Sequence, residues 1–352
     1  MALFEVTDYD RFVYESELKD FLPDHIFDVH THVYLDRYKP KPAAGEVKRT
    51  VTWPHLVAKE DSIEDLQETY RLMFPGKQAE ALIFSCSARS DAQNDYIVSC
   101  MKKTGWPGLY FTHPTQSAEE VERKVREGGF VGIKAYLSHS PKYIPEAEIR
   151  IFDFFPHEHL KLMNRMGGIV MLHIPRHGRL KDPVNLAQMI EIREKYPDVR
   201  LIIAHIGRAY NKNDIGDAFD IIDRAGVQMT WDFTANCCET AIRECIRHAG
   251  PKNVMFGTDF PILRMRTHRI EENNTYINLV PPGIYGDPAQ DPHLREVSAE
   301  EAGRITFFAY EELLSFKRAC LTLGVSREDV EDMMCNNALR LIDAARRDIY
   351  GI

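Results

Sequence analysis

Five side chains that could bind a metal ion or move a proton occur where short apolar segments end. Two histidines lie two residues apart in IFDVHTH, and a histidine or aspartate closes the later segments IVMLH, LIIAH and VMFGTD. These residues are His30, His32, His173, His205 and Asp259. A polar group at the end of an apolar strand is costly unless something pairs with it. Four imidazoles and a carboxylate that meet at one point favour Zn²⁺, with Mn²⁺ or another first-row cation as the alternative.

The elements that must position these residues follow from the apolar pattern. Eight short apolar segments alternate with amphipathic segments of helical period, which predicts parallel βαβ units. The predicted strands cover residues 26–32, 81–85, 109–112, 131–136, 169–173, 201–205, 227–232 and 254–259. The predicted helices include 62–74, 117–127, 183–196, 238–248, 301–323 and 327–347. The count of eight favours a closed barrel, and no GxGxxG or P-loop sequence follows a strand.

Two segments depart from this alternation. Residues 1–24 precede the first strand, and residues 262–300 follow the eighth, contain a Pro-Pro-Gly sequence and read as a long loop. Loops at that end of a barrel often cover the active site. We therefore predict that residues 1–352 form one α/β domain. Its fold is a (β/α)8 TIM barrel with an N-terminal extension, a long loop after strand eight and extra C-terminal helices.

In a barrel, the carboxyl ends of all strands converge on one cavity, where active sites are built. Side chains two residues apart on a strand share a face, so His30 and His32 are both expected to point into the barrel. The same alternation predicts that Phe27 and Val29 face the helices. Asp28, two residues before His30, is then inward-facing and is expected to orient one of the metal ligands.

Composition limits the classes of partner. The formal net charge of the 352 residues is −9, and a nucleic-acid-binding surface normally needs a basic excess. No Lys/Arg block predicts a membrane-surface patch, and no apolar run approaches the ~20 residues that span a bilayer. The seven cysteines are odd in number and lack CxxC spacing, which favours free thiols in the cytoplasm. The expected partner is a small-molecule substrate, and the sequence leaves open whether the chain forms a homo-oligomer.

The motifs together resemble the amidohydrolase superfamily, in the branch of metal-dependent hydrolases, lactonases and aromatic-acid decarboxylases. The matching motifs are DVHTH at 28–32, HIP at 173–175, AHIG at 204–207, FGTDFP at 256–261 and MMCNNALRLI at 333–342. The resemblance covers nearly the whole chain. It implies that His30, His32, His173 and Asp259 surround the metal, and that His205 is either a ligand or the group that polarises the substrate carbonyl.

The resemblance also implies a reaction. A bound cation lowers the pKa of water and polarises a carbonyl, while Asp259 takes the proton of that water and passes it to the leaving group. The leading hypothesis is therefore hydrolysis of an amide, lactone or related carbonyl bond in a small anionic molecule. The first alternative is non-oxidative decarboxylation of an unsaturated or aromatic acid. The second, of another class, is a catalytically inactive barrel used for binding.

Lys134 in VGIKAY allows three interpretations. Some amidohydrolases with two metals carry a carboxylated lysine on the fourth strand, and Lys134 could bridge metals in this way. It could also remain unmodified and contact the substrate or a neighbouring carboxylate, or extend its amine to solvent. An inward Lys134 would bring Gly132 and Tyr136 to the same face, with Val131 and Ile133 outward. We favour a single metal.

The substrate-facing candidates lie just past the proposed ligands. Arg176 and Arg208 each follow a predicted ligand histidine by three residues, and Lys134 and Tyr136 lie at the end of the predicted fourth strand. Guanidinium binds carboxylate in a bidentate manner, so the two arginines suit a substrate with a carboxylate. The alternative is that they are solvated loop charges. Arg264 and Arg266, after Asp259, are further candidates of the same kind.

Overall fold

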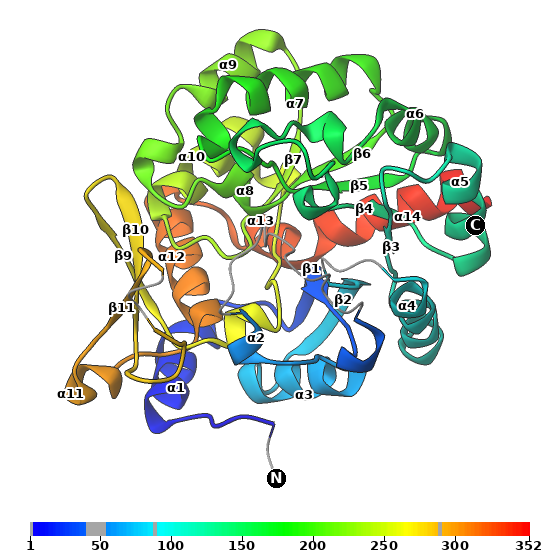
Figure 1. Cartoon of the computed structure of the whole chain (residues 1–352). Coiled ribbons are helices and arrows are strands. Elements are labelled where there is room, and N and C mark those ends of the chain that lie inside the picture. Colours follow the sequence, from blue (N-terminus) through cyan, green and yellow to red (C-terminus); the bar gives the residue numbers. More distant parts are fainter. Residues whose placement is uncertain (1–2, 40–53, 87–89, 288–290) are drawn as a thin grey trace.

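The computed structural model describes residues 3–39, 54–86, 90–287 and 291–352. The eight predicted strands are present in the centre of the molecule, and helices α3 to α10 follow one another around them (Figure 1). The strands are β1 His25–His32, β2 Gln78–Phe84, β3 Tyr110–Phe111, β4 Gly132–Lys134, β5 Ile169–Leu172, β6 Arg200–Ile203, β7 Thr230–Asp232 and β8 Val254–Met255. This arrangement confirms the predicted (β/α)8 TIM barrel.

The strands pair in the order of the sequence. β1 and β2 form one parallel pair, and β3 to β8 form a parallel six-stranded sheet. Isolated parallel bridges join the two sheets on both sides: Ile83 pairs with Gly108, and Thr31 pairs with Phe260. Each strand is therefore linked to the next one, and the first strand is linked to the segment that follows the eighth.

The helices begin where the sequence offers caps. Ser62 accepts a hydrogen bond from the Asp65 amide at 3.1 Å, and Ser117 accepts one from the Glu120 amide at 3.2 Å, which confirms the predicted helix starts. The helices are α1 Asp8–Val13, α2 Pro54–Val57, α3 Ile63–Met73, α4 Asp91–Thr104, α5 Ala118–Gly128, α6 His157–Met166, α7 Pro183–Lys195, α8 His205–Arg208, α9 Ala218–Ala225, α10 Glu239–Ala249, α11 Ala299–Ala302, α12 Phe308–Leu323, α13 Arg327–Glu331 and α14 Asn337–Tyr350. No helix among the described residues is both long and apolar enough to cross a membrane.

The final helix α14 packs against the interior of the barrel. Ala338 and Ile342 of α14 belong to the same buried cluster as the inward side chains of Phe27, Ile169 and Met255. Phe27 and Ile169 lie near the amino ends of their strands, whereas the histidines lie near the carboxyl ends. α14 thus covers the end of the barrel that is opposite the candidate site.

The first strand differs from the simple alternation that the sequence predicts. Its pairing with β2 shifts register between Asp28 and Thr31, so an extra residue is accommodated there. As a result Phe27 and Val29 lie in the inner cluster, and the prediction that they face the helices is wrong. The Asp28 side chain instead faces α3, where its Oδ2 accepts a hydrogen bond from the Tyr70 hydroxyl at 2.7 Å. The expected inward orientation of Asp28 is therefore also wrong.

The segment after the eighth strand is more ordered than a long loop. β9 His268–Glu272 and β10 Thr275–Val280 form an antiparallel hairpin, and β11 Leu294–Glu296 pairs in parallel with β10. Asn273 and Asn274 turn the hairpin with φ values of 50° and 62°, a conformation that asparagine tolerates. This small sheet lies beside α12, outside the ring of barrel helices (Figure 1).

Two further predictions are refined by the structure. The predicted helix 301–323 is divided into α11 and α12, while 327–347 is continuous because a π-helical turn, Asp332–Asn336, joins α13 to α14.

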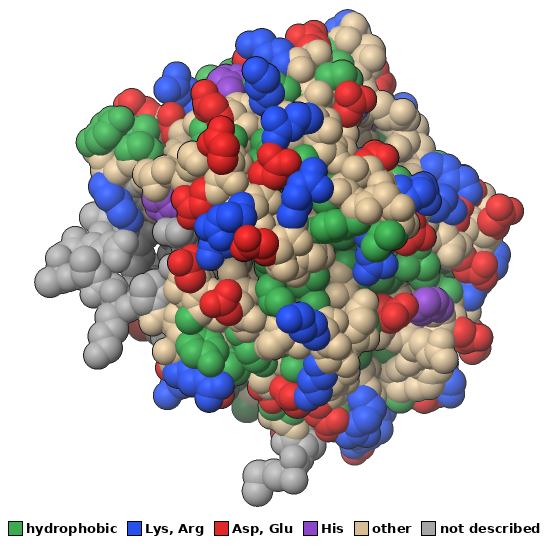
Figure 2. Space-filling view, turned by 90° about the vertical axis from the view of Figure 1, so that its right-hand side faces the viewer, with side chains coloured by type: hydrophobic (Ala, Val, Ile, Leu, Met, Phe, Trp, Pro, Cys, Tyr) green, Lys and Arg blue, Asp and Glu red, His purple; other side chains and the backbone are tan. Residues whose placement is uncertain are grey.

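On the face shown in Figure 2, Lys and Arg side chains alternate with Asp and Glu, and neither sign forms a continuous patch.

Candidate metal centre

Two histidines of β1 and the aspartate after β8 come within ligand distance of one another. The Asp259 Oδ1 atom lies 3.1 Å from His32 Nε2 and 3.8 Å from His30 Nε2. Neighbouring ligands of a tetrahedral or octahedral cation with bonds of about 2.1 Å are separated by roughly 3.0–3.4 Å. These three side chains could therefore hold one divalent cation.

The surroundings of His32 test whether a cation fits. Its Nδ1 lies 2.8 Å from the Ser85 carbonyl oxygen, and its Nε2 faces the Asp259 carboxylate. A carbonyl and an ionised carboxylate both act only as acceptors, and a neutral imidazole has one proton to donate. A cation between Nε2 and Oδ1 would remove this conflict, because both atoms would then present lone pairs to it. The donor set therefore fits a metal.

His30 and His205 are oriented in the same way through their Nδ1 atoms. His30 Nδ1 lies 3.0 Å from Asp232 Oδ2, and His205 Nδ1 lies 3.0 Å from the Thr234 carbonyl oxygen. Both contacts place the proton on Nδ1 and leave the lone pair on Nε2. Burial lowers the pKa of both imidazoles, which favours the neutral form that binds metal. The two ring centroids are 4.7 Å apart.

His173 lies at the edge of this group. Its ring centroid is 5.3 Å from that of His205, and its Nδ1 is buried with no hydrogen-bond partner among the described residues. Among the described residues, three sets of three potential ligand atoms lie within 4.8 Å of one another. Two of these sets belong to this site, and His173 is in none of the three. Burial and the charge of Arg208 lower the pKa of His173, so the ring is available in its neutral form.

The backbone at Asp259 and His205 is strained. Their φ values are 53° and 59°, in the left-handed region that non-glycine residues rarely adopt. Such residues concentrate at functional sites. Burial by itself raises the pKa of Asp259, but in the protein without a metal a hydrogen bond from His32 and the charge that His32 and His30 carry when protonated outweigh it and lower the pKa to about 2. The carboxyl is therefore ionised at neutral pH. Both residues follow their strands, which end earlier than predicted.

Asp232 is a site residue that the sequence analysis missed. Its Oδ2 holds His30 Nδ1, and its Oδ1 accepts a hydrogen bond from the His205 backbone amide at 2.7 Å. One carboxylate thus connects the two histidines. The signal was present in the sequence, because Asp232 closes the apolar segment of β7 just as the histidines close theirs.

Asp28 acts on the backbone and not on a ligand ring. Its Oδ1 accepts hydrogen bonds from the amides of His30 at 2.9 Å and Thr258 at 3.0 Å. It therefore joins β1 to the loop that carries Asp259. Burial raises the pKa of Asp28 to about 7, although its hydrogen bonds from Thr258 and Tyr70 act in the opposite direction.

Lys134 is buried inside the barrel, so the interpretation that its amine extends to solvent is wrong. In register it lies beside Met171, on the inner face, and its side chain is 1% exposed. Its Nζ lies 5.2 Å from the centre of the Phe84 ring and has no hydrogen-bond partner within the described residues. Burial lowers the pKa of Lys134 to about 8, although the charges of Asp232 and Asp259 raise it.

The substrate-facing candidates divide into two groups. Tyr136 lies next to His173, with ring centroids 4.8 Å apart, and the charge of Arg208 acts on both side chains. Arg208 also donates a hydrogen bond to the Pro175 carbonyl at 3.0 Å, which holds the loop after β5. Arg176 forms an ion pair at 3.1 Å with Asp182, the residue that caps α7, and the structure does not bring it to the histidines.

The other two arginine candidates are structural. Arg264 forms a buried ion pair at 2.9 Å with Asp61, and Arg266 forms one at 2.7 Å with Asp10. Both pairs join the segment after Asp259 to distant parts of the chain, so these arginines hold that segment in place. The interpretation of Arg264 and Arg266 as substrate-facing residues is not supported by these contacts.

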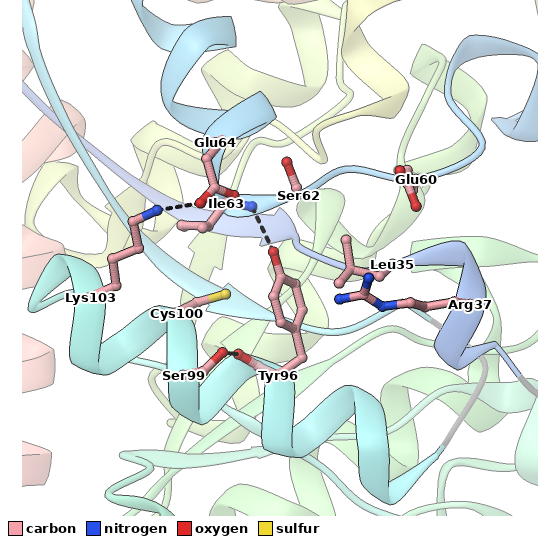
Figure 3. A pocket seen from close by; sticks show the side chains of 10 residues that line it. All are labelled: Leu35, Arg37, Glu60, Ser62, Ile63, Glu64, Tyr96, Ser99, Cys100 and Lys103. Atoms are coloured by element: carbon pink, nitrogen blue, oxygen red, sulfur yellow. Dashed lines mark hydrogen bonds and ion pairs between the residues drawn. The ribbon is translucent and has the colours of Figure 1, made fainter.

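A surface pocket of about 420 Å³ lies apart from the histidines, between the start of α3 and α4 (Figure 3). An ion pair between Lys103 and Glu64 crosses one side, and the Tyr96 hydroxyl accepts a hydrogen bond from the Ile63 amide at 3.1 Å. None of the predicted site residues lines this pocket. It is therefore distinct from the candidate metal centre.

Comparison with known proteins gives a family and a fold. Residues 27–343 match the amidohydrolase family profile Amidohydro_2. No curated protein matches the sequence. An amidohydrolase from Burkholderia multivorans, solved with bound HEPES, has a similar fold, with a TM-score of 0.55 and 12% identity over 90% of this chain and 99% of that chain.

Two further solved structures resemble this chain. A dihydroxybenzoic acid decarboxylase from Polaromonas sp. JS666, with bound manganese and the inhibitor 2-nitroresorcinol, has a TM-score of 0.53 and 14% identity over 93% of this chain and 100% of its own. A candidate 2-pyrone-4,6-dicarboxylic acid hydrolase from Pseudomonas putida has a TM-score of 0.53 and 14% identity, over 92% and 99%. At these identities the likeness concerns the fold alone.

Proposed function

Because this chain belongs to the amidohydrolase family, we propose that it is a metal-dependent hydrolase of a small anionic molecule. The bond cleaved is an amide, a lactone or a related carbonyl bond. The observation that carries this proposal is the position of His32 between two acceptors, the Ser85 carbonyl and the Asp259 carboxylate. A divalent cation between Nε2 and the carboxylate satisfies both contacts while the imidazole donates only through Nδ1.

The proposed ligands are His30, His32, His173, His205 and Asp259. A divalent cation bound to them, for which the nitrogen-rich set favours Zn²⁺ over Mn²⁺, supplies a lowered pKa for water and polarisation of a carbonyl. His205 is assigned as a ligand because its Nδ1 donates to the Thr234 carbonyl. Its Nε2 then carries a lone pair and has no proton to donate to a substrate carbonyl.

A single cation is proposed. Asp232 belongs to the second set of close ligand atoms, together with His30 and His205. Its two oxygens, however, already hold the His30 ring and the His205 amide. Lys134, which would bridge two metals after carboxylation, is assigned instead as an unmodified amine that contacts the substrate.

Asp259 is the proposed proton carrier. Its Oδ1 faces the two histidines of β1, and the other carboxylate oxygen could accept a proton. The carboxylate would take the proton of the attacking water and later donate it to the leaving group. The left-handed backbone of Asp259 directs the side chain toward the two histidines of β1.

The charges around the site support an anionic substrate. Lys134 and Arg208 are positive, and both lower the pKa of His173, which indicates that they lie near it. The Lys134 amine is buried and has no hydrogen-bond partner among the described residues, so a bound carboxylate would complete its surroundings. Tyr136 lies beside His173 and is proposed as a further substrate contact. Arg176 remains a candidate only if a bound substrate displaces Asp182.

A panel assay tests the reaction. The protein is stripped with a chelator, reloaded with Zn²⁺ or Mn²⁺, and offered lactones and N-acyl compounds that carry a carboxylate, together with aromatic carboxylic acids. We expect metal-dependent release of acid, followed in a pH-stat, without CO2. Release of CO2 would instead establish the decarboxylase alternative. No turnover, together with no stoichiometric cation, would establish a binding barrel.

A further inference from the structure

The turn that follows β7 connects the metal centre to a distant helix. Ala235 in this turn has a φ of 55°, in the left-handed region. The Thr234 carbonyl accepts the hydrogen bond from His205 Nδ1 at 3.0 Å. The Ala235 amide, which is the other side of the same peptide unit, donates to Glu312 Oε2 at 2.5 Å. One peptide plane therefore joins Glu312 to His205.

The rigidity of this peptide unit makes the connection directional. The C=O and N–H groups of a trans peptide are coplanar and point in opposite directions. Fixing the Ala235 N–H toward Glu312 therefore fixes the direction of the Thr234 carbonyl toward His205. Hydrogen bonds in such a chain also polarise one another, so an acceptor on the N–H makes the carbonyl a better acceptor.

Glu312 is an unusual residue for its position. It lies on α12, its side chain is 0% exposed, and its Oε1 has no hydrogen-bond partner among the described residues. Burial raises the pKa of Glu312, and the carboxyls of Asp28 and Asp232 raise it further. A buried carboxyl that makes one hydrogen bond is costly, and an apolar side chain is the usual occupant of such a place. A role other than packing would explain its presence.

We propose that Glu312 is a positioning residue that orients His205 through the Thr234–Ala235 peptide. By holding this peptide, Glu312 keeps the His205 proton on Nδ1 and the lone pair on Nε2. The inference deepens the proposed function, because it assumes that His205 Nε2 serves the metal centre. Arg269 also contacts this turn, donating to the Ala235 carbonyl at 2.8 Å, but it acts on the next peptide unit and not on the one that His205 uses.

Three variants separate orientation from packing. Glu312→Gln keeps an acceptor at the same reach, Glu312→Met keeps the length but removes the acceptor, and Glu312→Asp withdraws the acceptor by one methylene. Ser315→Ala is the matched control. It removes a buried hydroxyl from the same helix. This hydroxyl donates to the Glu311 carbonyl and accepts from Arg318, and both partners belong to α12.

The experiment uses the full chain labelled with 15N-histidine. Long-range 1H–15N spectra of the metal-free protein report which nitrogen of His205 carries the proton, and the signal is assigned from its absence in a His205→Gln variant. Competition with a chromophoric chelator then gives the Zn²⁺ affinity of each variant. Circular dichroism and thermal unfolding check that each variant folds.

In wild type, Glu312→Gln and Ser315→Ala we expect His205 protonated on Nδ1 and similar Zn²⁺ affinities. In Glu312→Met and Glu312→Asp we expect a mixture of tautomers and an affinity lower by about 10–100-fold, the usual effect of losing a group that orients a ligand. The proposal is overturned if Glu312→Met keeps the wild-type tautomer and affinity, or if Glu312→Gln loses both.

Two safeguards keep the result interpretable. If Glu312→Met does not fold, the comparison of Glu312→Gln with Glu312→Asp decides, since both keep a polar side chain in the cavity. The proposed function fails separately: a wild-type protein that binds no Zn²⁺ would contradict the metal centre, while its tautomer spectra would still report on Glu312.

Discussion

At the scale of single residues, the proposed metal centre depends on which imidazole nitrogen carries the proton. Asp232 holds His30 through Nδ1, and the Ser85 and Thr234 carbonyls hold His32 and His205 in the same way. Each contact leaves Nε2 as the proposed ligand atom. The orientation of the three rings therefore rests on acceptors that lie behind them, not on the histidines alone.

Replacing Asp232 tests this dependence. In Asp232→Asn, the amide oxygen can still accept from the His205 backbone, but the amide nitrogen then faces His30 Nδ1 and favours the wrong tautomer. We expect the Zn²⁺ affinity to fall by about 10–100-fold, as for other groups that orient a ligand. Chelator competition measures the affinity, and Asp214→Asn, at a carboxylate that contacts loop residues such as Arg179, serves as control. An unchanged affinity in Asp232→Asn would refute the assigned orientation.

Lys134 gives a prediction about pH. Its pKa of about 8 means that the ammonium form is present below that pH and is lost as the pH rises through it. Binding of an anionic substrate should therefore be strongest below about pH 8 and weaken above it. A charge-assisted hydrogen bond contributes roughly 1.5–3 kcal/mol, so Lys134→Met should weaken binding by about 10–100-fold at pH 7.

Lys134→Met should also abolish the decrease in substrate affinity above about pH 8. KM or Kd for the identified substrate, measured between pH 6 and pH 9.5, checks both effects. If Lys134→Met keeps the wild-type pH profile, another group is responsible and the assignment of Lys134 fails.

The predicted site residues that the structure brings together share one feature: each is a polar group at the end of an apolar strand. His30, His32 and Asp259 were found in this way and lie within ligand distance of one another. Arg176 was chosen for proximity in sequence alone, and its partner Asp182 belongs to the loop that follows. No sequence pattern indicated a role for Glu312, because a glutamate on an amphipathic helix usually faces solvent.

At the scale of elements, the apolar pattern predicted where the strands lie better than it predicted which of their side chains point into the barrel. Gly132, Ile133 and Lys134 have the expected faces, since Lys134 lies beside Met171 and Ile133 beside Val170. The prediction that Val131 faces outward is wrong, because Val131 belongs to the inner cluster. The first strand failed because a register shift depends on the partner strand, which a single sequence pattern does not contain. The hairpin of β9 and β10 was missed because its Asn-Asn turn was read as part of a loop.

The junction between β1 and the loop after β8 makes stability depend on pH. The pKa of Asp28 is about 7 in the folded protein and roughly 3.9 in an unfolded chain. The folded state then binds this proton more tightly. The contribution of Asp28 is most favourable below about pH 4 and is lost progressively as the pH rises toward 7, by up to about 4 kcal/mol.

Asp28→Asn should remove this dependence. Urea unfolding of the metal-free protein at several pH values from 4.5 to 7.5 gives the free energy of unfolding of each form. We expect the stability of the variant relative to wild type to increase across that range. If the free energies of unfolding of variant and wild type change with pH in the same way, Asp28 has the same pKa in the folded and unfolded states. This result would contradict the prediction.

At the scale of the whole molecule, the eight strands and the barrel fold were predictable because each strand repeats the same apolar signal. The position of α14 across one end of the barrel was not predictable from the sequence, because it depends on how segments that are distant in the chain pack together. The barrel therefore has two functionally different ends. One end is filled by apolar side chains, and the other carries the histidines.

This division predicts independent effects. Ile342 of α14 is 2% exposed in the inner cluster, so Ile342→Ala should lower the free energy of unfolding by roughly 2–5 kcal/mol. The Zn²⁺ affinity should not change, since the cavity forms at the opposite end. Urea unfolding and chelator competition measure the two quantities. A large loss of affinity with little loss of stability would contradict the separation of the two ends.

The most direct test of the metal centre is anomalous X-ray diffraction from crystals grown with Zn²⁺, collected above and below the zinc absorption edge. We predict one strong anomalous peak, with bonds of about 2.0–2.2 Å to His30 Nε2, His32 Nε2 and an oxygen of Asp259. No peak at this position, or a peak beyond bonding distance of these three side chains, would contradict the central claim.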